Sequence, residues 1–441
     1  MGDRSISIVG IGKLGAPIAA CFAARGFRVV AVDVNPDTIA KINQGESPVY
    51  EPALAELIQQ NRDRLTATTH LENAVLQTDI TFILVPTPTD SQDGFSLEYV
   101  IPACESIGAA LRSKSNFHLI VLTSTVMPGS TTAKVLPVLE SKSGKRCGRD
   151  FGLCYSPEFV ALGSVIADFF HPDFLLIGES DDESGDMLSR LYKQVCKNDP
   201  PIARMNFVNA EITKLAVNTF VTTKISYANM LARICERLPG ADVDTITTAL
   251  GMDSRIGGRY LRGAIGYGGP CFPRDNLAMV SLARQLEIPA LLPEATDRAN
   301  RSEVARLASL VKAQMMDGGT VAVLGLSYKP NTNVVEQSQG LHLAQMLGSE
   351  GFRVICFDPA GMSNAAPLLP SSVRLAGSLS ECAAAGDVIV VTTPWQEFHS
   401  LQSEVKNRNG KVIIDCWRMF GANQFGSSVK YLRLGEGKAA D

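Results

Sequence analysis

One stretch of the sequence occurs twice, and this repeat limits the folds that the chain can adopt. Residues 26–33 read Gly-Phe-Arg-Val-Val-Ala-Val-Asp, and residues 351–358 read Gly-Phe-Arg-Val-Ile-Cys-Phe-Asp. Each copy follows a strand-like run, a turn that contains glycine and a helical pattern. Because strand–helix–strand units build parallel sheets, the repeat predicts two similar α/β units, one near each end of the chain.

The rest of the sequence indicates how the two units are connected. Strand-like runs alternate with helical patterns at the start of the chain and return at Thr320. Between them, residues 209–238 read as one long helix that ends at Pro239-Gly240, with Asn209 as its N-cap and Glu211 in its first turn. We therefore expect an α/β fold in which two Rossmann-like parallel-sheet domains are joined by a central helical domain. The expected boundaries are residues 1–200, 201–300 and 301–441.

The composition argues against several classes of protein. The chain has 441 residues, enough for two or three domains, and a formal net charge of -4, which argues against a nucleic-acid partner. Its ten cysteines form no CxxC pair and its five histidines have no metal-ligand spacing, so we expect no metal. Because no leader or membrane-length apolar run is found, the sequence predicts a soluble, cytoplasmic protein without a membrane partner.

A glycine-rich turn directly after the first strand indicates a dinucleotide site. Residues 10–15 read Gly-Ile-Gly-Lys-Leu-Gly and open a helix of small residues. In such turns the first glycine allows the tight bend, the second lets a pyrophosphate approach, and the third lets helix and strand pack closely. Asp33 ends the second strand, where a carboxylate binds ribose hydroxyls and repels a 2′-phosphate, so NAD is favoured over NADP. The alternative is a purely structural turn.

The C-terminal copy differs at this turn. Its residues 325–329 read Gly-Leu-Ser-Tyr-Lys and lack the second and third glycines. We therefore expect the second unit to bind something other than a dinucleotide.

A single cysteine between two prolines is the most informative chemical feature. Residues 266–275 read Gly-Tyr-Gly-Gly-Pro-Cys-Phe-Pro-Arg-Asp. We expect the glycines to let a substrate approach the backbone and the prolines to restrict the loop. The thiolate of Cys271 can attack an aldehyde, and the resulting thiohemiacetal can lose a hydride to become a thioester that water hydrolyses. The alternative is a small buried hydrophobic residue, which is the expectation for the other nine cysteines.

The predicted long helix supplies two further candidates and one apolar face. Lys214 and Asn218 are four residues apart and share a face, where they can exchange a proton and stabilise an oxyanion. From spacing alone, a solvated face is the stronger alternative. An apolar face can pack against a partner subunit or inside the protein. It comprises Ile225, Ala228, Leu231, Ala232 and Cys235.

Taken in order, these motifs resemble the UDP-glucose/GDP-mannose dehydrogenase family over nearly the whole chain. The resemblance includes the glycine turn, residues 43–52 (Asn-Gln-Gly-Glu-Ser-Pro-Val-Tyr-Glu-Pro), Pro86-Thr87-Pro88, Ser124-Thr125-Val126, Ser156-Pro157-Glu158-Phe159, residues 214–220, the Cys271 loop and residues 325–330. It implies a nucleotide-sugar dehydrogenase that uses NAD for a four-electron oxidation of the sugar C6 alcohol to the carboxylate, and a homodimer or higher homo-oligomer.

The resemblance also implies roles for single residues. Cys271 corresponds to the nucleophile, Lys214 to the general acid/base or oxyanion partner, and Asn218 and Asp275 to the groups that position and activate water. Thr125 and Glu158 correspond to residues near the cofactor and the hydrolytic water. The implied cofactor-binding residues are Gly10, Gly12, Lys13, Leu14, Gly15, Asp33, Thr87, Pro88, Thr125 and Glu158. The implied substrate-binding residues are Glu158, Phe159, Val160, Lys214, Asn218, Arg255, Tyr260, Arg262, Gly266, Tyr267, Gly268 and Lys329.

Two of these substrate residues have a special place in the family. Arg255 corresponds to an arginine that can reach a neighbouring active site across a dimer interface, and Lys329 to a lysine of the C-terminal domain. The chain departs from the family pattern at Leu162 and Glu336, both on the expected nicotinamide side.

Four interpretations of the substrate and activity stay open. The cysteine loop resembles the UDP-glucose branch, which favours oxidation of UDP-glucose to UDP-glucuronate, as in polysaccharide biosynthesis. The same chemistry on another UDP-, GDP- or TDP-hexose is the first alternative. An ordinary two-electron dehydrogenase would have no use for Cys271. A catalytically silent nucleotide-sugar sensor would bind without turnover.

Overall fold

The computed structural model describes residues 5–406 and 408–437. The chain divides into two compact units, Met1–Ala216 and Val217–Asp441. Helix α9, Phe207–Cys235, begins in the first unit and continues into the second. In the described part of the chain, no helix combines the length and the apolar character needed to cross a membrane.

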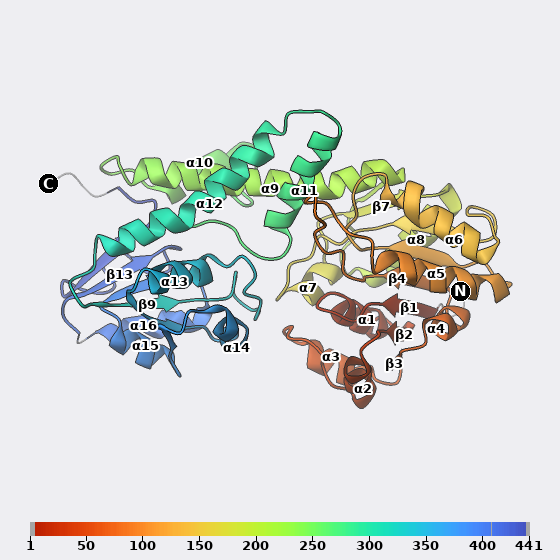
Figure 1. Ribbon diagram of the computed structural model, residues 1–441, viewed down its shortest axis with the longest axis horizontal. Coiled ribbons are helices and arrows are strands. Elements are labelled where there is room, and N and C mark those ends of the chain that lie inside the picture. Colours follow the sequence, from red (N-terminus) through yellow and green to blue (C-terminus); the bar gives the residue numbers. More distant parts are fainter. Residues whose placement is uncertain (1–4, 407, 438–441) are drawn as a thin grey trace. The chain divides into compact units, whose positions relative to one another are not determined.

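The N-terminal unit contains an eight-stranded sheet (Figure 1). Its order is β3-β2-β1-β4-β5-β6-β7-β8, and neighbouring strands are parallel except β6 and β7. The strands are β1 (Ser5–Val9), β2 (Arg28–Val32), β3 (Leu65–Thr68), β4 (Ile80–Ile83), β5 (Leu119–Leu122), β6 (Gly152–Tyr155), β7 (Leu175–Glu179) and β8 (Ile202–Met205). The order in which the chain adds strands to the sheet reverses between β1 and β4. Ligands bind at this position in such sheets.

Helices cover both faces of this sheet. One apolar core lies under α1 (Gly15–Ala24), α3 (Leu54–Gln60), α7 (Val165–Phe170) and α8 (Asp182–Val195). The opposite face packs against α4 (Leu71–Gln77), α5 (Val100–Ser113), the π-helix η1 (Thr131–Val135) and α6 (Leu136–Ser143). Helix α2 (Pro36–Gln44) follows β2 and begins at Asn35, whose side chain accepts from the N–H of Asp37. Burial on both faces explains why the strands read as continuous apolar runs.

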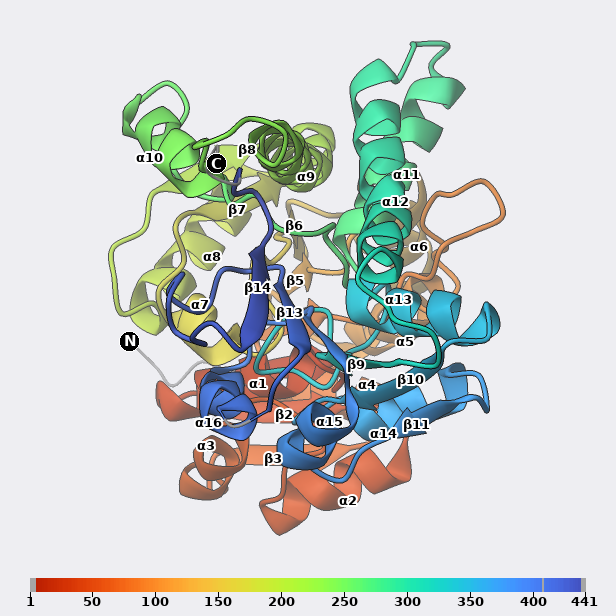
Figure 2. The same ribbon diagram turned by 90° about the vertical axis from the view of Figure 1, so that its left-hand side faces the viewer.

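The C-terminal unit combines helices with a six-stranded parallel sheet of order β11-β10-β9-β12-β13-β14. The helices before the sheet are the second part of α9, α10 (Val243–Met252), α11 (Phe272–Gln285) and α12 (Leu291–Lys312), and α11 and α12 run side by side (Figure 2). The strands are β9 (Thr320–Leu324), β10 (Arg353–Phe357), β11 (Val373–Leu375), β12 (Val388–Val391), β13 (Lys411–Asp415) and β14 (Val429–Arg433).

Short helices and one longer helix cover the six-stranded sheet. Helices α12 and α13 (Gln339–Ser349) pack on one face, while α15 (Leu379–Ala385) and α16 (Leu401–Val405) pack on the other. The connections contain α14 (Met362–Ala365), η2 (Ala366–Leu368) and η3 (Gln396–Ser400). The predicted fold class, two Rossmann-like sheets with helices between them, is therefore confirmed.

The prediction for the start of the long helix was wrong. The helix begins at Phe207, and the side chain of Asn206 accepts a hydrogen bond from the N–H of Asn209 at 3.0 Å, so Asn206 caps it. Glu211 is fully buried and does not sit in the first turn. Its carboxylate instead accepts from the N–H of Gly129 at 2.5 Å and of Thr131 at 2.8 Å, and burial raises its pKa. Sequence spacing could not reveal this partner, which is about eighty residues away.

The apolar face predicted on α9 belongs to the interior. Ala228, Ala232 and Cys235 are buried, and Ala232 and Cys235 pack against Val243 at the start of α10. Three of the five residues of this face therefore belong to the internal core, while Ile225 and Leu231 are half-buried.

Candidate active site

The three glycines after β1 have three different surroundings. Gly10 has φ +96°, and a Cβ there would lie 2.7 Å from the carbonyl oxygen of Leu84. At Gly15 a Cβ would lie 1.8 Å from the carbonyl oxygen of Gly10, so a side chain cannot be accommodated. A Cβ at Gly12 would meet nothing within 4 Å. The outer glycines are therefore required by the fold, and Gly12 faces open space where a ligand can approach.

Helix α1 offers a positive end at this turn. Leu14 is the residue before the helix, Lys13 is exposed beside it, and the first turn contains no acidic side chain. The partial positive charge of a helix N-terminus favours phosphate groups.

Asp33 at the end of β2 completes the turn. Its two carboxylate oxygens accept from the N–H of Ile11 at 2.8 Å and of Asn35 at 2.9 Å, and the residue is half-buried. Because a carboxylate has about four acceptor sites, capacity remains for two ribose hydroxyls. The turn and Asp33 therefore fit NAD.

The segments after β4 and β5 are joined by a hydrogen bond. Thr87 and Pro88 follow β4, Thr125 follows β5, and the Ser124 hydroxyl donates to the carbonyl of Val85 at 2.6 Å. This bond ties the two loops together. The predicted cofactor residues Thr87, Pro88 and Thr125 therefore lie at neighbouring strand ends beside β1.

Lys214 and Glu158 meet in the N-terminal unit. The Lys214 ammonium donates to the carbonyl oxygen of Glu158 at 2.6 Å and lies 4.6 Å from the ring centroid of Phe159, and Lys214 is 8% exposed. Burial raises the pKa of Glu158 to about 7, and the charge of Lys214 opposes that rise. Val160, which follows Phe159, packs against the apolar core. A carboxyl group that titrates near neutrality is suited to proton transfer.

Cys271 stands immediately before helix α11 in the C-terminal unit. It is exposed, whereas eight of the other cysteines are buried and Cys147 is half-buried. A position at the N-terminal end of a helix stabilises an anionic sulfur.

Asp275 lies one helical turn after Cys271, and Asn218 on α9 contacts Asp275. Asp275 is 1% exposed, its N–H donates to the carbonyl of Cys271 at 2.8 Å, and its carboxylate accepts from the Asn218 amide at 2.5 Å. The second oxygen of Asp275 lies 3.6 Å from Arg274 Nε. The structure thus brings together three of the predicted catalytic residues. Lys214 lies one turn before Asn218 on α9.

The glycines near Cys271 have close protein neighbours. A Cβ at Gly268 would lie 2.3 Å from the carbonyl oxygen of Gln337, and one at Gly269 would lie 2.6 Å from the ring of Tyr328. At Gly266 a Cβ would meet two side-chain oxygens at 2.6 Å. These glycines therefore allow other segments of the protein to pack closely against the loop.

Three other predicted substrate residues of this unit pack against aromatic side chains. Tyr260 and Tyr267 pack edge-on against Phe272, next to Cys271. Arg262 donates to the carbonyl of Trp417 at 2.6 Å and stacks over its ring at 5.8 Å.

The last two predicted substrate residues differ in exposure. Arg255 is 86% exposed at its side chain and pairs with Asp253 at 2.6 Å, so the structure does not join it to Cys271. Lys329 is half-buried in the loop after β9.

The C-terminal sheet contains a glycine whose role the sequence did not reveal. At Gly340, near the start of α13, a Cβ would lie 2.0 Å from the carbonyl oxygen of Gly325. Gly340 therefore repeats the packing role of Gly15, although fifteen residues separate it from Gly325.

Asp358, the counterpart of Asp33, is 1% exposed. Its carboxylate accepts six hydrogen bonds, from the N–H groups of Leu326, Ser327, Ala360 and Gly361, the Ser327 hydroxyl and the Trp395 indole.

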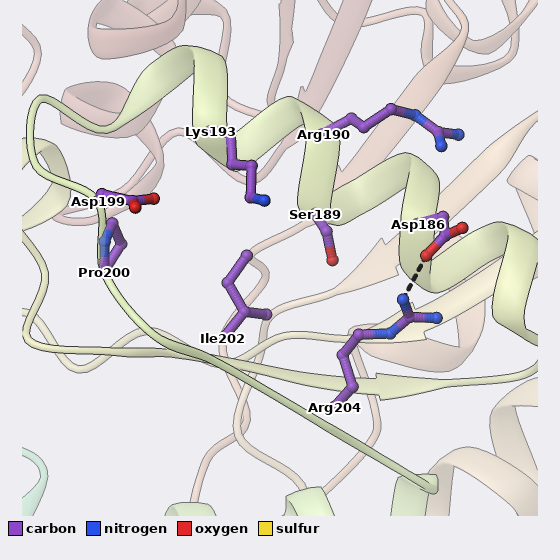
Figure 3. A pocket seen from close by; sticks show the side chains of 8 residues that line it. All are labelled: Asp186, Ser189, Arg190, Lys193, Asp199, Pro200, Ile202 and Arg204. Carbon is purple, nitrogen blue, oxygen red and sulfur yellow. Dashed lines mark hydrogen bonds and ion pairs between the residues drawn. The ribbon is translucent and has the colours of Figure 1, made fainter.

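A cavity of about 410 Å³ lies elsewhere in the N-terminal unit. It is lined by α8 and the segment leading into β8, and Arg204 at its rim is paired with Asp186 (Figure 3). Strand β8 is the sheet edge, five positions from β1, so this cavity is separate from the cofactor crevice.

Together, a dinucleotide turn in one Rossmann unit and a second Rossmann unit whose acid is fully occupied define a two-domain nicotinamide-dependent dehydrogenase. Residues 4–196, 208–302 and 322–422 match, in turn, the NAD binding domain, the central domain and the UDP binding domain of the UDP-glucose/GDP-mannose dehydrogenase family. The chain belongs to this family and is an NAD-dependent nucleotide-sugar 6-dehydrogenase.

Individual relatives agree with this assignment. A UDP-glucose 6-dehydrogenase of Haloferax volcanii is 37% identical over 94% of this chain and 96% of its own length. A GDP-mannose 6-dehydrogenase of Pseudomonas aeruginosa is 34% identical over 93% of this chain and 95% of its own. The structure of a UDP-glucose dehydrogenase from Pyrobaculum islandicum superposes with a TM-score of 0.89 at 33% identity, covering 99% of this chain and 98% of that one.

Proposed function

We propose that this chain oxidises the C6 alcohol of UDP-glucose in two steps to UDP-glucuronate, with Cys271 as a covalent relay. The observation that carries the proposal is an exposed cysteine at the start of α11, one helical turn from a buried carboxylate–carboxamide pair. A two-electron alcohol dehydrogenase needs no such nucleophile.

The first oxidation uses residues of α9. The unprotonated amine of Lys214 takes the proton of the substrate hydroxyl, directly or through water, a hydride leaves C6 to give the aldehyde, and Asn218 donates a hydrogen bond to the developing oxyanion. NAD, when bound, takes up one hydride in each of the two oxidations. Residues 1–200 hold it through Gly10, Gly12, Lys13, Leu14, Gly15, Asp33, Thr87, Pro88, Thr125 and Glu158.

The second oxidation begins at the sulfur. The thiolate of Cys271 adds to the aldehyde carbon, and the oxygen takes up a proton to give a thiohemiacetal. Loss of that proton and of a hydride leaves a thioester. Asp275 and Asn218 position a water molecule, Glu158 and Thr125 assist its deprotonation, and hydrolysis restores the thiol and releases the carboxylate.

Cationic and aromatic residues hold the nucleotide sugar. Lys329 and Arg262 neutralise the diphosphate, because a guanidinium or ammonium group binds phosphate oxygens well. The segments around them complete the sugar site. These are Glu158, Phe159 and Val160, then Tyr260, Gly266, Tyr267 and Gly268. In this assignment residues 301–441 bind the nucleotide, and residues 201–300 supply the cysteine loop and the subunit contact.

UDP-glucose is the proposed substrate because a relative with that activity in its name is 37% identical over nearly the whole chain. A GDP-mannose 6-dehydrogenase at 34% identity makes GDP-mannose the first alternative. Other UDP-hexoses and TDP-hexoses are the next alternative substrates.

We also propose that the chain forms a homodimer in the cytoplasm. An apolar stripe runs along the second part of α9, where Phe220 is 67% exposed and Tyr227, Met230 and Ile234 are also exposed. Phe220, Tyr227 and Ile234 are spaced by seven residues, the repeat with which two helices pack along each other. Arg255 is the residue expected to cross this interface.

The relay is tested by trapping its intermediate. Asp275→Asn removes the carboxylate that positions water, so thioester hydrolysis should slow more than thioester formation. Mixed with UDP-glucose and NAD and then quenched in acid, this variant should carry the mass of a UDP-glucuronyl group on the Cys271 peptide. Cys271→Ser, treated alike, is the control that should carry none.

The outcomes separate the alternatives. An adduct with GDP-mannose or a TDP-hexose instead of UDP-glucose would change the substrate and keep the chemistry. Carboxylate product without any adduct on Cys271 would contradict the relay. Tight nucleotide-sugar binding without product would favour a sensor.

A further inference from the structure

One residue of the cysteine loop is held on both sides of its backbone by a single buried side chain. The N–H of Tyr267 donates to Oδ1 of Asn300 at 2.7 Å, and Nδ2 of Asn300 donates to the Tyr267 carbonyl at 3.0 Å. Asn300 lies inside α12 and is 7% exposed. Its amide therefore acts as the partner that a neighbouring strand would provide, and it fixes the loop four residues before Cys271.

The other end of Tyr267 is also fixed. Its hydroxyl accepts from Nδ2 of Asn276 at 2.8 Å, and Asn276 is the fully buried neighbour of Asp275 on α11. The same amide donates to the Thr222 hydroxyl on α9 at 2.9 Å. The Tyr267 ring meets Phe272 edge-on, with centroids 6.1 Å apart. Tyr267 thus connects α12, α11 and α9 around the cysteine.

We call the two hydrogen bonds between Asn300 and the Tyr267 backbone the clamp. The residue before Tyr267 leaves room for it. A Cβ at Gly266 would lie 2.6 Å from Oδ1 of Asn300 and 2.6 Å from Oε1 of Gln339, so a larger residue there would displace these two oxygens. Gln339 makes the longer contact with the same Tyr267 carbonyl, at 3.3 Å. Asn300 is the one of the two that engages both polar groups of the peptide.

The geometry points to Asn300 as a positioning residue that sets the place of Cys271 through Tyr267. This inference rests on the proposed role of Cys271 as the nucleophile. A reacting atom displaced by about 1 Å can cost about a hundredfold in rate, even when binding contacts far from it stay intact. Loss of the clamp should therefore lower kcat and spare the affinity for nucleotide and NAD.

Asn300→Ala is the direct test. Its kcat should fall about tenfold to a hundredfold, with KM for the nucleotide sugar and for NAD changed less than threefold. Arg301→Ala is the matched control, because Arg301 is the exposed neighbour on the same helix and pairs with Asp297 at the surface. It should keep kcat within twofold.

A second readout needs no turnover. The rate at which iodoacetamide alkylates Cys271 should change at least threefold in Asn300→Ala, while alkylation of the half-buried Cys147 in the same sample stays constant. UDP binding measured by calorimetry shows that the variant is folded.

Asn300→Asp keeps the shape of the clamp if the variant above fails to fold. The introduced carboxyl can accept from the Tyr267 N–H when ionised, and can also donate to the Tyr267 carbonyl when protonated. Its kcat relative to that of the unmodified chain should therefore rise as the pH is lowered from 9 to 6. A ratio that is reduced equally at every pH would overturn the inference.

The inference and the proposed function fail in different ways. Unchanged kcat and unchanged Cys271 alkylation in folded Asn300→Ala would overturn the clamp, whatever the chemistry. Full four-electron turnover by Cys271→Ser would overturn the relay, and alkylation of Cys271 would still report whether Asn300 positions the loop.

Discussion

Each Rossmann unit carries a carboxylate at the end of the corresponding strand, β2 in one and β10 in the other, and the two carboxylates have different hydrogen-bond partners. In the N-terminal unit Asp33 is half-buried and accepts two backbone hydrogen bonds, so its oxygens can still receive ribose hydroxyls. In the C-terminal unit Asp358 is buried and accepts six hydrogen bonds from its own unit. Since six donors exceed the about four acceptor sites of a carboxylate, Asp358 has no place left for a ligand.

The turn between the first strand and its helix is also longer in the C-terminal unit. Gly10 and Gly15 are five residues apart, and the helix begins at once. Gly325 and Gly340 make the same close contact across fifteen residues, and the inserted loop supplies several of the donors to Asp358. The two units therefore share the packing of strand and helix, whereas only the C-terminal unit encloses its carboxylate with donors of its own chain.

The largest expected effect is on the buried acid. Asp358→Ala leaves several buried donors unpaired and should lower the free energy of unfolding of the C-terminal unit by about 4 kcal/mol or more. Trp395 and Trp417 are the only tryptophans, and both lie in this unit, so tryptophan fluorescence during urea unfolding reports it selectively. Asp33→Ala, the matched change, should leave that transition in place. If both variants shifted the tryptophan transition equally, the proposed difference between Asp358 and Asp33 would be contradicted.

The packing glycines should matter equally in both units. Gly340→Ala puts a Cβ 2.0 Å from a carbonyl oxygen and should cost about 3 kcal/mol, seen as an earlier tryptophan transition. Gly15→Ala faces a contact of 1.8 Å and should destabilise the N-terminal unit by a similar amount. Far-ultraviolet circular dichroism should detect that loss while the tryptophan transition stays put. If Gly340→Ala unfolds like the unmodified chain, the proposed equivalence of the two glycines is wrong.

Asp33 should affect cofactor affinity more than stability. Asp33→Ala removes the acceptor for the ribose hydroxyls and should raise KM for NAD about tenfold to a hundredfold, while the preference for NAD over NADP falls. Steady-state kinetics with both cofactors measure this. Asp37→Ala is the control, because Asp37 is an exposed carboxylate at the start of α2. A similar rise in KM for that control would point to general charge rather than ribose binding.

Gly12 should behave unlike the other glycines of its turn. A Cβ there meets no protein atom within 4 Å, so Gly12→Ala should unfold within about 0.5 kcal/mol of the unmodified chain. The new methyl group would stand where the pyrophosphate approaches, and KM for NAD should rise about tenfold. A stability loss as large as that of Gly15→Ala would show that the space beside Gly12 is needed by the fold.

The smallest effect is a pH dependence located in the N-terminal unit. Burial raises the pKa of Glu158 to about 7, so its basic form grows between pH 6.5 and 8, and kcat limited by hydrolysis should rise about fourfold. Glu158→Gln should flatten this profile. Because the folded pKa lies above the usual 4.5, ionisation of Glu158 also costs stability, and the N-terminal unit should become less stable as the pH rises from 4.5 through 7. An unchanged profile in Glu158→Gln would exclude this carboxyl as the titrating group.

The sequence predicted those features that depend on neighbours along the chain. Gly10, Gly12 and Gly15 follow a strand and open a helix, and a turn of this kind has few alternatives. The repeat at residues 351–358 likewise predicted the second sheet, because strand, turn and helix succeed one another in both copies. Cys271 between two prolines was identified from local sequence alone, and its exposure at the start of α11 agrees with that interpretation.

Features that depend on distant partners could not be predicted. The sequence could not show that Gly340 replaces Gly15, because ten additional residues separate it from its strand. Nor could it show that Asp358 is enclosed, since its donors come from three separate segments. Asn300 gave no signal, because a buried amide that clamps a backbone has no characteristic spacing in the chain.

In the proposed relay one active site performs two successive oxidations through Cys271. The most direct test is the amount of NADH released per UDP-glucose consumed, with the sugar product identified by mass. We predict two NADH per UDP-glucuronate for the unmodified chain, and stalling before the acid in Cys271→Ser. One NADH per sugar, or acid formation that is indifferent to Cys271, would contradict the relay.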